Sequence, residues 1–494
     1  MSLMGIDIGT TGTKAIAFDS DGNIIGSDYR EYNLLFPEPG WVEFDTAAQW
    51  KTVFEVLKNV NSNPAVKKDP VTALSVSTFG EGLTPVDESG NIIFNTIYST
   101  DARSVKELEM VLSRYTPMEL FEITGYPPGF MCPLNKIIWI KNNRPDIFKR
   151  TRRIMFTDEI FAQKLGVEEP RINHSLASRT LFFDVRKKTW WNDILVEFGI
   201  DPLLFSKPVD SGEVIGTIRD KVAAELGFKK GVYFVSGCHD QPCAALGTGA
   251  VTGGISADGM GTVECVTICM EDAITNEDML KYNFGCQAHG VKDKYVTLAY
   301  NLSSGSVVKW FRDNIADGQS RTIRELSSNL TFEPSRLYTL PYFSATGTPY
   351  FDPVSKGSII GLDLGTSKAD IFKGLVEGLV FEICFNLELV KHSGIKITEL
   401  RATGGGSKSD YELKLKASLI DSPILRMDIT EAGCIATMML AGIGTKKFTL
   451  EEAISKFVRV RDRFEPDKKI RERYLDKFEN YKKIYDSISG LFSQ

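Results

Sequence analysis

The sequence predicts an α/β protein built from two similar halves that face each other. Three observations lead to this prediction: the length of 494 residues, a strand–turn–strand motif at the N-terminus, and the return of the same pattern at residues 255–267. A chain of this length exceeds the size at which one hydrophobic core stops growing, so two domains are expected. We place these domains at residues 4–245 and 246–494, with no Pro- or Ser-rich linker between them.

The N-terminal motif covers residues 6–19 and reads IDIGTTGTKAIAFD. Asp7 closes its first strand, and the donors of the turn and the next strand follow in the order Gly9, Thr10, Thr11, Lys14. Free backbone N–H groups, hydroxyls and an ammonium group can hold phosphate, while a carboxylate can hold Mg²⁺. The motif therefore predicts a phosphate site, with a simple hairpin turn as the alternative. No G-x-x-x-x-G-K-[ST] sequence occurs in the chain.

Hydrophobic spacing and turn residues predict the other elements in order. Strands are predicted as three short segments within 4–35 and at 71–78, 231–236 and 255–267. Helices are predicted at 46–60, over most of 101–165 with a break at 125–129, after residue 241, and at 367–393, 408–420 and 449–490. The last of these carries many charges among its apolar positions, so we expect a solvated amphipathic helix.

The composition argues against several classes of partner. A net charge of −6 with 25% charged and 43% hydrophobic residues is ordinary for a globular protein and unlike a nucleic-acid or membrane-surface binder. No apolar run is long enough for a membrane span, and no secretory signal opens the chain. Its eight cysteines include no C-x-x-C pair, so we expect a reducing, cytoplasmic location without disulfides.

A second candidate site is the sequence His239-Asp240-Gln241 at the exit of the predicted strand 231–236. A carboxylate held beside an amide at a strand end suits a general base that takes a proton from a substrate hydroxyl. Phosphoryl transfer needs little more from a protein than such a base, Mg²⁺ and phosphate donors. The alternative is that Asp240 only caps the following helix.

Two further clusters contain residues that suit ligand binding. Gly404, Gly405 and Gly406 precede Ser407 between a strand and a helix, which permits close approach to a flat or charged ligand; a glycine cap is the alternative. Gly80 and Glu81 follow the strand 71–78, and Asp101 and Arg103 come shortly after. Carboxylates and a guanidinium near a strand end can read sugar hydroxyls, or they can equally form a surface ion pair.

Taken together, these motifs resemble the FGGY carbohydrate kinase family, in the right order and over almost the whole chain. Residues 7–11 match its first phosphate loop, and residues 131–142 fit its first signature at every specified position. Gly237-x-x-Asp240-Gln241 matches the segment with the family's catalytic aspartate, and Gly261-Thr262 matches the second phosphate loop. The further similar segments are the nucleotide-side loop at 304–306, the adenosine motif at 404–407 and the helix at 431–442.

The resemblance implies two actin-like, ribonuclease-H-like domains with a nucleotide and sugar cleft that closes on binding. It implies ATP and Mg²⁺ as cofactors and transfer of the γ-phosphoryl group to a sugar or polyol hydroxyl, with Asp240 as base. Carried over residue by residue, it assigns metal to Asp7 and Asp240; phosphate and nucleotide to Gly9, Thr10, Thr11, Lys14, Gly261, Thr262, Gly305, Gly404, Gly405, Gly406 and Ser407; and substrate to Gly80, Glu81, Asp101, Arg103, Met131 and Gln241.

Departures from the family pattern bear on the acceptor. Gly80-Glu81 stands where glycerol kinases carry Arg-Glu and xylulokinases usually Met-His, and the local pattern is similar to the xylulokinase and L-fuculose-kinase-like branch. Loss of the side chain at Gly80 predicts room for a five- or six-carbon ketose in place of glycerol. A glycerol- or erythritol-type polyol kinase and an actin-like ATPase without sugar transfer are the alternatives. The individual sugar, the hydroxyl, regulation and the oligomeric state, a homodimer included, stay open.

Overall fold

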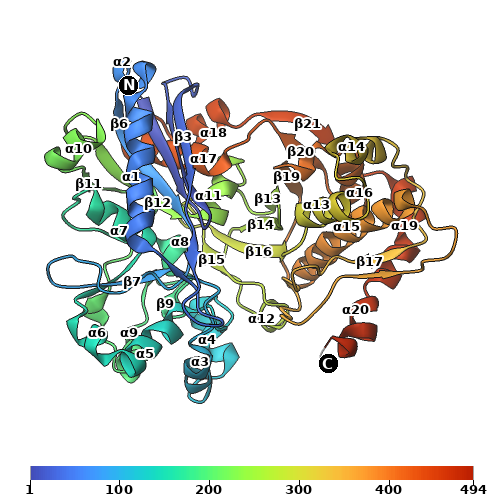
Figure 1. The fold of residues 1–494 in the computed structure, drawn as a ribbon, viewed down its shortest axis with the longest axis horizontal. Helices are drawn as coiled ribbons and strands as arrows, with labels where there is room; N and C mark the ends of the chain where they lie inside the picture. The colour runs from blue at the N-terminus through green and yellow to red at the C-terminus, as the bar shows by residue number, and fades with distance from the viewer. Residues whose placement is uncertain (1, 493–494) are drawn as a thin grey trace.

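The computed structural model describes residues 2–492 and consists of two α/β halves that lie side by side (Figure 1). The N-terminal half, blue to green, occupies the left of Figure 1, and the C-terminal half, yellow to red, occupies the right. The helices α17 (Ala432–Gly444) and α18 (Leu450–Phe457) are exceptions, because they come late in the chain and lie against the first half. Among residues 2–492, no helix is both long and apolar enough to cross a lipid bilayer.

The first half is built around a six-stranded sheet. Its strands, in spatial order, are β11 (Val214–Thr217), β12 (Tyr233–His239), β6 (Val71–Thr78), β1 (Ser2–Ile8), β2 (Gly12–Phe18) and β3 (Ile24–Glu31). β1 runs antiparallel to β2 and parallel to β6, which is parallel to β12. The register places Asp7 beside Ser77, and Ser77 beside Cys238. The carboxyl ends of three parallel strands therefore meet at one edge, where Asp7 and Asp240 both lie.

Helices cover both faces of this sheet, as the alternation of side chains along β1 requires. Met4, Ile6 and Ile8 face a core shared with α1 (Thr46–Ser62), α2 (Pro64–Lys68), α7 (Thr157–Lys164) and α10 (Asp220–Leu226). The opposite face packs on α11 (Asp240–Gly247), α17 and α18. The helix α17 crosses so closely that a Cβ on Gly5 would lie 1.8 Å from the carbonyl oxygen of Cys434, so only glycine fits there.

The second half repeats this frame in a seven-stranded sheet. Its strands, in spatial order, are β15 (Gln287–Ala288), β16 (Tyr295–Asn301), β14 (Glu264–Met270), β13 (Ile255–Met260), β19 (Glu399–Thr403), β20 (Ile424–Met427) and β21 (Val460–Phe464). β13 is antiparallel to β14 and parallel to β19, as β1 is to β2 and β6. One core joins this sheet to the helices α13 (Gly305–Asn314), α15 (Lys368–His392), α16 (Asp410–Ile420), α19 (Lys468–Tyr481) and α20 (Ile484–Ile488).

A mainly helical insertion extends the first half and has its own core. Its helices are α3 (Val105–Leu112), α4 (Pro117–Thr124), α5 (Pro133–Asn143), α6 (Pro145–Arg150), α8 (His174–Ala177), α9 (Asn192–Glu197) and η1 (Pro202–Leu204). Its strand pairs are β7 (Leu83–Val86) with β8 (Arg153–Phe156) and β9 (Phe183–Asp184) with β10 (Thr189–Trp190). The remaining elements are β4 (Leu34–Leu35), β5 (Glu43–Phe44), α12 (Glu277–Lys281), α14 (Ser320–Ser328), β17 (Tyr338–Leu340), β18 (Ser358–Ile360), η2 (Gly406–Lys408) and η3 (Ser489–Leu491).

The structure confirms the predicted fold class and corrects two elements. The region 101–165 contains the strand β8, which forms because it pairs with β7 and has no local helical competitor strong enough to prevent it. The region 449–490 is not one helix: β21 interrupts it and pairs with β20, and α19 buries Tyr474 and Phe478 in the second core. The division between residues 245 and 246 stays a prediction.

Candidate active site

Asp240 lies where β12 passes into α11, at the edge of the first sheet. Burial raises the pKa of its carboxyl group to about 7; the charge of Asp7 adds to this rise and Arg179 opposes it. His239 Nε2 lies 3.1 Å from Asp240 Oδ1. Burial and the charge of Arg179 hold the pKa of His239 well below its usual range, which favours a neutral ring beside the Asp240 carboxylate. The Asp240 side chain is 37% exposed, as a base that meets a substrate must be.

Asp7, the penultimate residue of β1, lies under the N-terminus of α17. A Cβ on Gly433 would lie 3.6 Å from the Asp7 carboxyl carbon. Burial, with a smaller contribution from Glu431, raises the pKa of Asp7, while Lys14 lowers it. Lys14 forms an ion pair with Glu431, so this predicted phosphate ligand already has an anionic partner. The carboxylate of Asp7 lacks a comparable direct cation among the described residues, which makes it a suitable ligand for a hard cation.

The first Gly/Thr turn connects β1 to β2 and is closed by a hydrogen bond from Gly9 N to Gly12 O of 2.9 Å. Thr11 is exposed, and Gly9 and Thr10 are half-buried. The turn is therefore accessible to a ligand, while the strands on both sides are buried. The charged groups next to it are Asp7 and the Lys14–Glu431 pair.

The second Gly/Thr turn lies between β13 and β14 and is closed by a hydrogen bond from Gly261 N to Val263 O of 2.9 Å. The nucleotide-side loop docks onto it: Gly305 N donates to Gly261 O (3.0 Å), and Ser304 N donates to Thr262 O (3.1 Å). A Cβ on Gly404, whose φ is +86°, would lie 2.6 Å from Met260 O. The structure thus brings three separately predicted nucleotide segments together around one turn.

Within the glycine cluster the residues differ in their contacts. Gly405 is exposed, and no atom lies within 4 Å of where its Cβ would be. Ser407 is buried, and its hydroxyl donates to Gly404 O at 2.8 Å, so it stabilises the turn itself. The roles of Gly405 and Ser407 toward a nucleotide stay predictions.

A buried ion cluster stabilises the two strands that flank the second turn. Lys416 of α16 contacts both Asp258 of β13 and Glu264 of β14, and all three side chains are at most 2% exposed. Ser304 Oγ donates to Glu264 at 3.1 Å, which ties the nucleotide-side loop to the same cluster. Sequence reasoning missed this cluster, because Lys416 is more than 150 residues from both acids and no local spacing marks it.

We use the name acceptor recess for Asp240 and the residues grouped around it: Gly80, Glu81, Tyr126 and Arg179. Glu81 accepts a hydrogen bond from Tyr126 Oη (2.8 Å) and forms an ion pair with Arg179. Its φ of +57° is rare for a residue with a side chain. Such strain is typical of functional sites.

The expectation that Gly80 opens free space is wrong. A Cβ on Gly80 would lie 3.0 Å from the ring of His239 and 3.4 Å from Cγ of Arg179. These two side chains therefore fill the volume next to Gly80, and Arg179 supplies Glu81 with a cationic partner. The expectation was wrong because it considered only the side chain missing at residue 80 and not the side chains that other elements place beside it.

Asp101 and Arg103 lie in the interior and bind each other. Asp101 accepts hydrogen bonds from Val42 N and from Arg103 N, Nε and Nη2, and Arg103 also pairs with Glu43 at 2.8 Å. The Arg103 guanidinium lies 4.0 Å from the ring centre of Trp41. An ion pair was the alternative considered for these residues, but it was expected at the surface, whereas both side chains are buried. Their assignment as sugar ligands stays a prediction, and their contacts support a positioning role.

The signature at residues 131–142 covers the start of α5 and holds a neighbouring segment in place. Lys136 is buried and donates to the carbonyl oxygens of Tyr98 (2.6 Å) and Ser99 (3.2 Å). Burial lowers the pKa of Lys136 to about 8. Met131 precedes α5, Gln241 follows Asp240 in α11, and both are half-buried. Their role as substrate ligands stays a prediction.

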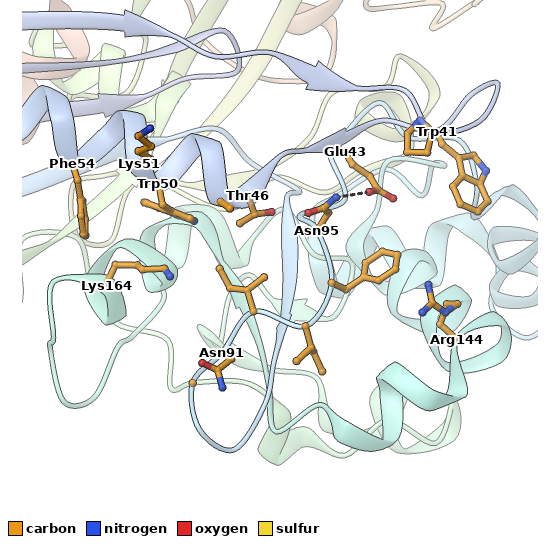
Figure 2. Close-up of a pocket in the computed structure, with 16 residues that line it drawn as sticks. Trp41, Glu43, Thr46, Trp50, Lys51, Phe54, Asn91, Asn95, Arg144 and Lys164 are labelled. Carbon is orange, nitrogen blue, oxygen red and sulfur yellow. Dashed lines mark hydrogen bonds between the residues drawn. The ribbon is translucent and has the colours of Figure 1, made fainter.

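A groove of about 930 Å³ lies on the N-terminal half, away from these residues. Figure 2 shows Trp41, Trp50, Lys51, Phe54, Arg144 and Lys164 around it. Glu43 accepts a hydrogen bond from Asn95 (3.0 Å; Figure 2). Its ion pair with Arg103 connects the wall of the groove to the Asp101–Arg103 pair. None of the predicted site residues lines this groove, so its size does not make it the reaction site.

Two residues of the acceptor recess, Tyr126 and Arg179, were missed from the sequence. Tyr126 lies in the break between α4 and α5, five residues before the signature at 131–142, and was assigned only to that break; Arg179 follows α8 and is not close in sequence to a motif. Their contacts with Glu81 depend on the tertiary fold. The unusual His239 next to Asp240 was visible in the sequence, but its contact with Gly80 was not.

Comparisons with known proteins identify related sequences and structures over almost the whole chain. The model of the N-terminal domain of the FGGY family of carbohydrate kinases matches residues 2–247, and the model of its C-terminal domain matches residues 259–445. The chain is 26% identical to a xylulose kinase of Bacillus subtilis, over 99% of this chain and 97% of that protein. It is 26% identical to a glycerol kinase of Thermococcus kodakarensis (95% and 94% covered). A gluconate kinase structure from Lactobacillus acidophilus shares the fold, with a TM-score of 0.91, 22% identity and coverage of 100% and 99%.

Proposed function

Because this chain belongs to the FGGY family of carbohydrate kinases, we propose that it transfers the γ-phosphoryl group of ATP to a hydroxyl of a five- or six-carbon ketose. The observation that carries this proposal is the position of Asp240, a partly exposed carboxylate within electrostatic reach of Asp7, Glu81 and Arg179. One carboxylate can thus take a proton from a hydroxyl while others bind metal and acceptor.

We assign the nucleotide to the surroundings of the second Gly/Thr turn. Gly261, Thr262, Gly305 and Gly404 converge there through backbone contacts, and the two turn residues are exposed. Exposed backbone N–H groups in a glycine turn suit phosphate. The first turn, with Gly9, Thr10 and Thr11, suits the phosphoryl group from the opposite half.

The residues present fit Mg²⁺. Within residues 2–492, no group of three or more His, Cys, Asp or Glu side chains could hold a metal by itself. Mg²⁺ is usually held by one or two carboxylates together with substrate phosphates, so Asp7, assisted by Asp240, is a sufficient protein contribution. When bound, the ion would neutralise charge on the transferred phosphoryl group.

The protein's own part in the reaction is to position groups and move one proton. Asp240 accepts the proton of the attacking hydroxyl, and the His239 ring, 3.1 Å away, packs against its carboxylate. Glu81 accepts from one or two other hydroxyls of the acceptor. Lys136 holds the segment 98–99 beside this region. Closure of the two halves brings the two turns onto the same phosphoryl group and excludes water.

The acceptor class is inferred from the relatives. Xylulose kinases are prominent among the relatives, and glycerol kinases form a second group at similar identity. The recess lacks an arginine at residue 80, where glycerol kinases carry one, although Arg179 provides a guanidinium from another element. A glycerol- or erythritol-type polyol is the second candidate acceptor. The free, buried state of all eight cysteines favours the cytoplasm as its location.

A screen of ketoses and polyols with coupled detection of ADP tests this function. We expect ADP release to rise steeply with a pentulose or hexulose and to stay low with ATP alone or with glycerol. Asp240→Asn should reduce turnover roughly 10²–10⁴-fold while ATP binding changes only a few-fold. Efficient use of glycerol with inert ketoses would contradict the acceptor class. Retention of half the parental kcat in Asp240→Asn would contradict the base.

A further inference from the structure

Arg179 lies on a short element that is held by both halves of the molecule. It directly follows Ser178, at the end of α8. Ser175 Oγ accepts a hydrogen bond from His239 N (2.8 Å), next to the proposed base. Ser178 Oγ accepts one from Ala288 N (3.1 Å) in the second half. The backbone that carries Arg179 is thereby fixed at the boundary of the two halves, as a binding residue requires.

The positive charge of Arg179 is already paired inside the protein. Its guanidinium forms an ion pair with Glu81, and the two side chains are 12% and 5% exposed. The guanidinium also lies 4.7 Å from the ring centre of Tyr126, which donates to the same carboxylate. An anion that entered the recess would therefore have to compete with Glu81 for this cation.

The guanidinium nevertheless keeps a donor to offer. Arg179 Nε is buried and has no hydrogen-bond partner among residues 2–492. A buried N–H group without a partner is costly, and proteins rarely leave one unsatisfied. The charge of Arg179 also acts on Asp240 and on Cys265 and Tyr300 of the second sheet, so the group is close to the proposed base and to the second half. An acceptor hydroxyl held near Asp240 would therefore also lie near the Nε–H group of Arg179.

We propose that Arg179 is an acceptor-binding residue that selects neutral polyhydroxy acceptors over anionic ones; this rests on the proposed kinase function. Its guanidinium donates to an acceptor oxygen, and Glu81 cancels its charge. With Asp240 included, the recess contains two carboxylates and one guanidinium. A neutral ketose or polyol gains hydrogen bonds there, whereas an aldonate such as gluconate meets net negative charge and no free cation.

The test compares Arg179→Met, Glu81→Gln and the double variant, with gluconate and the best neutral acceptor from the screen as probes. We expect Arg179→Met to raise KM for the neutral acceptor at least tenfold while KM for ATP stays within twofold. Glu81→Gln frees the guanidinium, so kcat/KM for gluconate relative to the neutral acceptor should rise at least tenfold. The double variant should lose this gain, because the freed cation is gone.

Arg186→Met is the matched control, since Arg186 donates to Glu122 O and Thr275 Oγ1 outside the recess. It should leave both acceptor KM values unchanged. Equal changes of KM for ATP and acceptor in Arg179→Met, or unchanged discrimination against gluconate in Glu81→Gln, would overturn the proposal. If Arg179→Met does not fold, two other variants test the proposal: Glu81→Gln, which preserves side-chain volume, and Arg179→Lys, which preserves charge.

Failure of the proposed function has a different outcome. A parental enzyme that prefers glycerol contradicts the ketose acceptor, but glycerol is also neutral, so the same variants then test Arg179 with glycerol as the probe. A parental enzyme that prefers gluconate overturns the selection of neutral acceptors directly.

Discussion

The two Gly/Thr turns of the molecule share one backbone frame and differ in the state of the acidic residues behind them. In the first half Asp7 is half-buried, has no direct cation among residues 2–492, and lies under the start of α17. In the second half Asp258 and Glu264 are fully enclosed, and Lys416 contacts both. An accessible, uncompensated carboxylate suits metal chemistry, whereas an enclosed and paired one suits structural support. We therefore assign the acidic residue behind the first turn to the reaction and the two acidic residues behind the second turn to structural support.

The largest expected effect comes from removing the cation of the buried cluster that Lys416 forms with Asp258 and Glu264, which we call the anchor. Lys416→Met leaves Asp258 and Glu264 buried without a counter-charge, so we expect a loss of about 3–5 kcal/mol in the free energy of unfolding. Urea denaturation measures this loss. The triple variant with Asp258→Asn and Glu264→Gln removes all three charges and should recover most of the stability. A loss below about 1 kcal/mol in the single variant would show that the cluster does not support the turn.

The corresponding change in the first half should affect metal binding and not stability. Asp7→Asn should weaken Mg²⁺ binding roughly 10–100-fold and raise the Mg²⁺ concentration that half-maximal turnover requires. Its free energy of unfolding should stay equal or increase, because a buried charge without a direct cation is removed. Mg²⁺ titration of turnover and urea denaturation are the measurements. Asp21→Asn, at an exposed turn of the same sheet, is the control; an unchanged Mg²⁺ profile in Asp7→Asn would contradict the comparison.

A smaller effect should distinguish two adjacent glycines near the second turn. Gly404→Ala places a Cβ 2.6 Å from Met260 O at a φ of +86°, so we expect a cost of about 1–3 kcal/mol and a raised KM for ATP. Gly405→Ala is the matched control, since no atom lies within 4 Å of its Cβ position. Thermal unfolding and ATP kinetics measure both variants. Equal behaviour of the two would argue against close packing of the glycine cluster on the turn.

The smallest effect concerns pH. The pKa of Asp240 is raised to about 7, and a base must be ionised to accept a proton. As pH falls below 7 the protonated fraction grows, so kcat/KM for the acceptor should fall about tenfold per pH unit. The pKa of Glu264 is also raised to about 7 by burial, but this residue lies in the anchor and should not enter the rate profile. A kcat/KM that is constant between pH 5.5 and 8 would contradict the role of Asp240.

The sequence was sufficient for the fold class and for most backbone elements of the site. Glycine turns and strand ends are local features, so the positions of Asp7, Asp240, Gly261 and Gly404 at such turns and strand ends could be expected from patterns within a few residues, while their roles stay predictions. The side-chain partners could not be predicted in this way. Arg179 meets Glu81, and Lys416 meets Asp258, only because distant elements pack together.

The same reason explains the incorrect expectations about Gly80 and about residues 449–490. The space beside Gly80 is filled by His239 and Arg179, which belong to other elements. The strand β21 exists because β20 offers it an edge, although the region around it has helical spacing. Tertiary contacts override local preference in both cases.

The position of α17 and α18 also determines the mechanics of the molecule. The chain passes between the halves three times: from α11 to β13, from β20 to α17 and from α18 to β21. A single connection would let two rigid bodies swivel in every direction. Several connections at one boundary favour rotation of the two halves about one axis and oppose twisting and sliding of one half against the other. For the closure proposed above, we therefore expect the side chains on each half to return to the same mutual alignment.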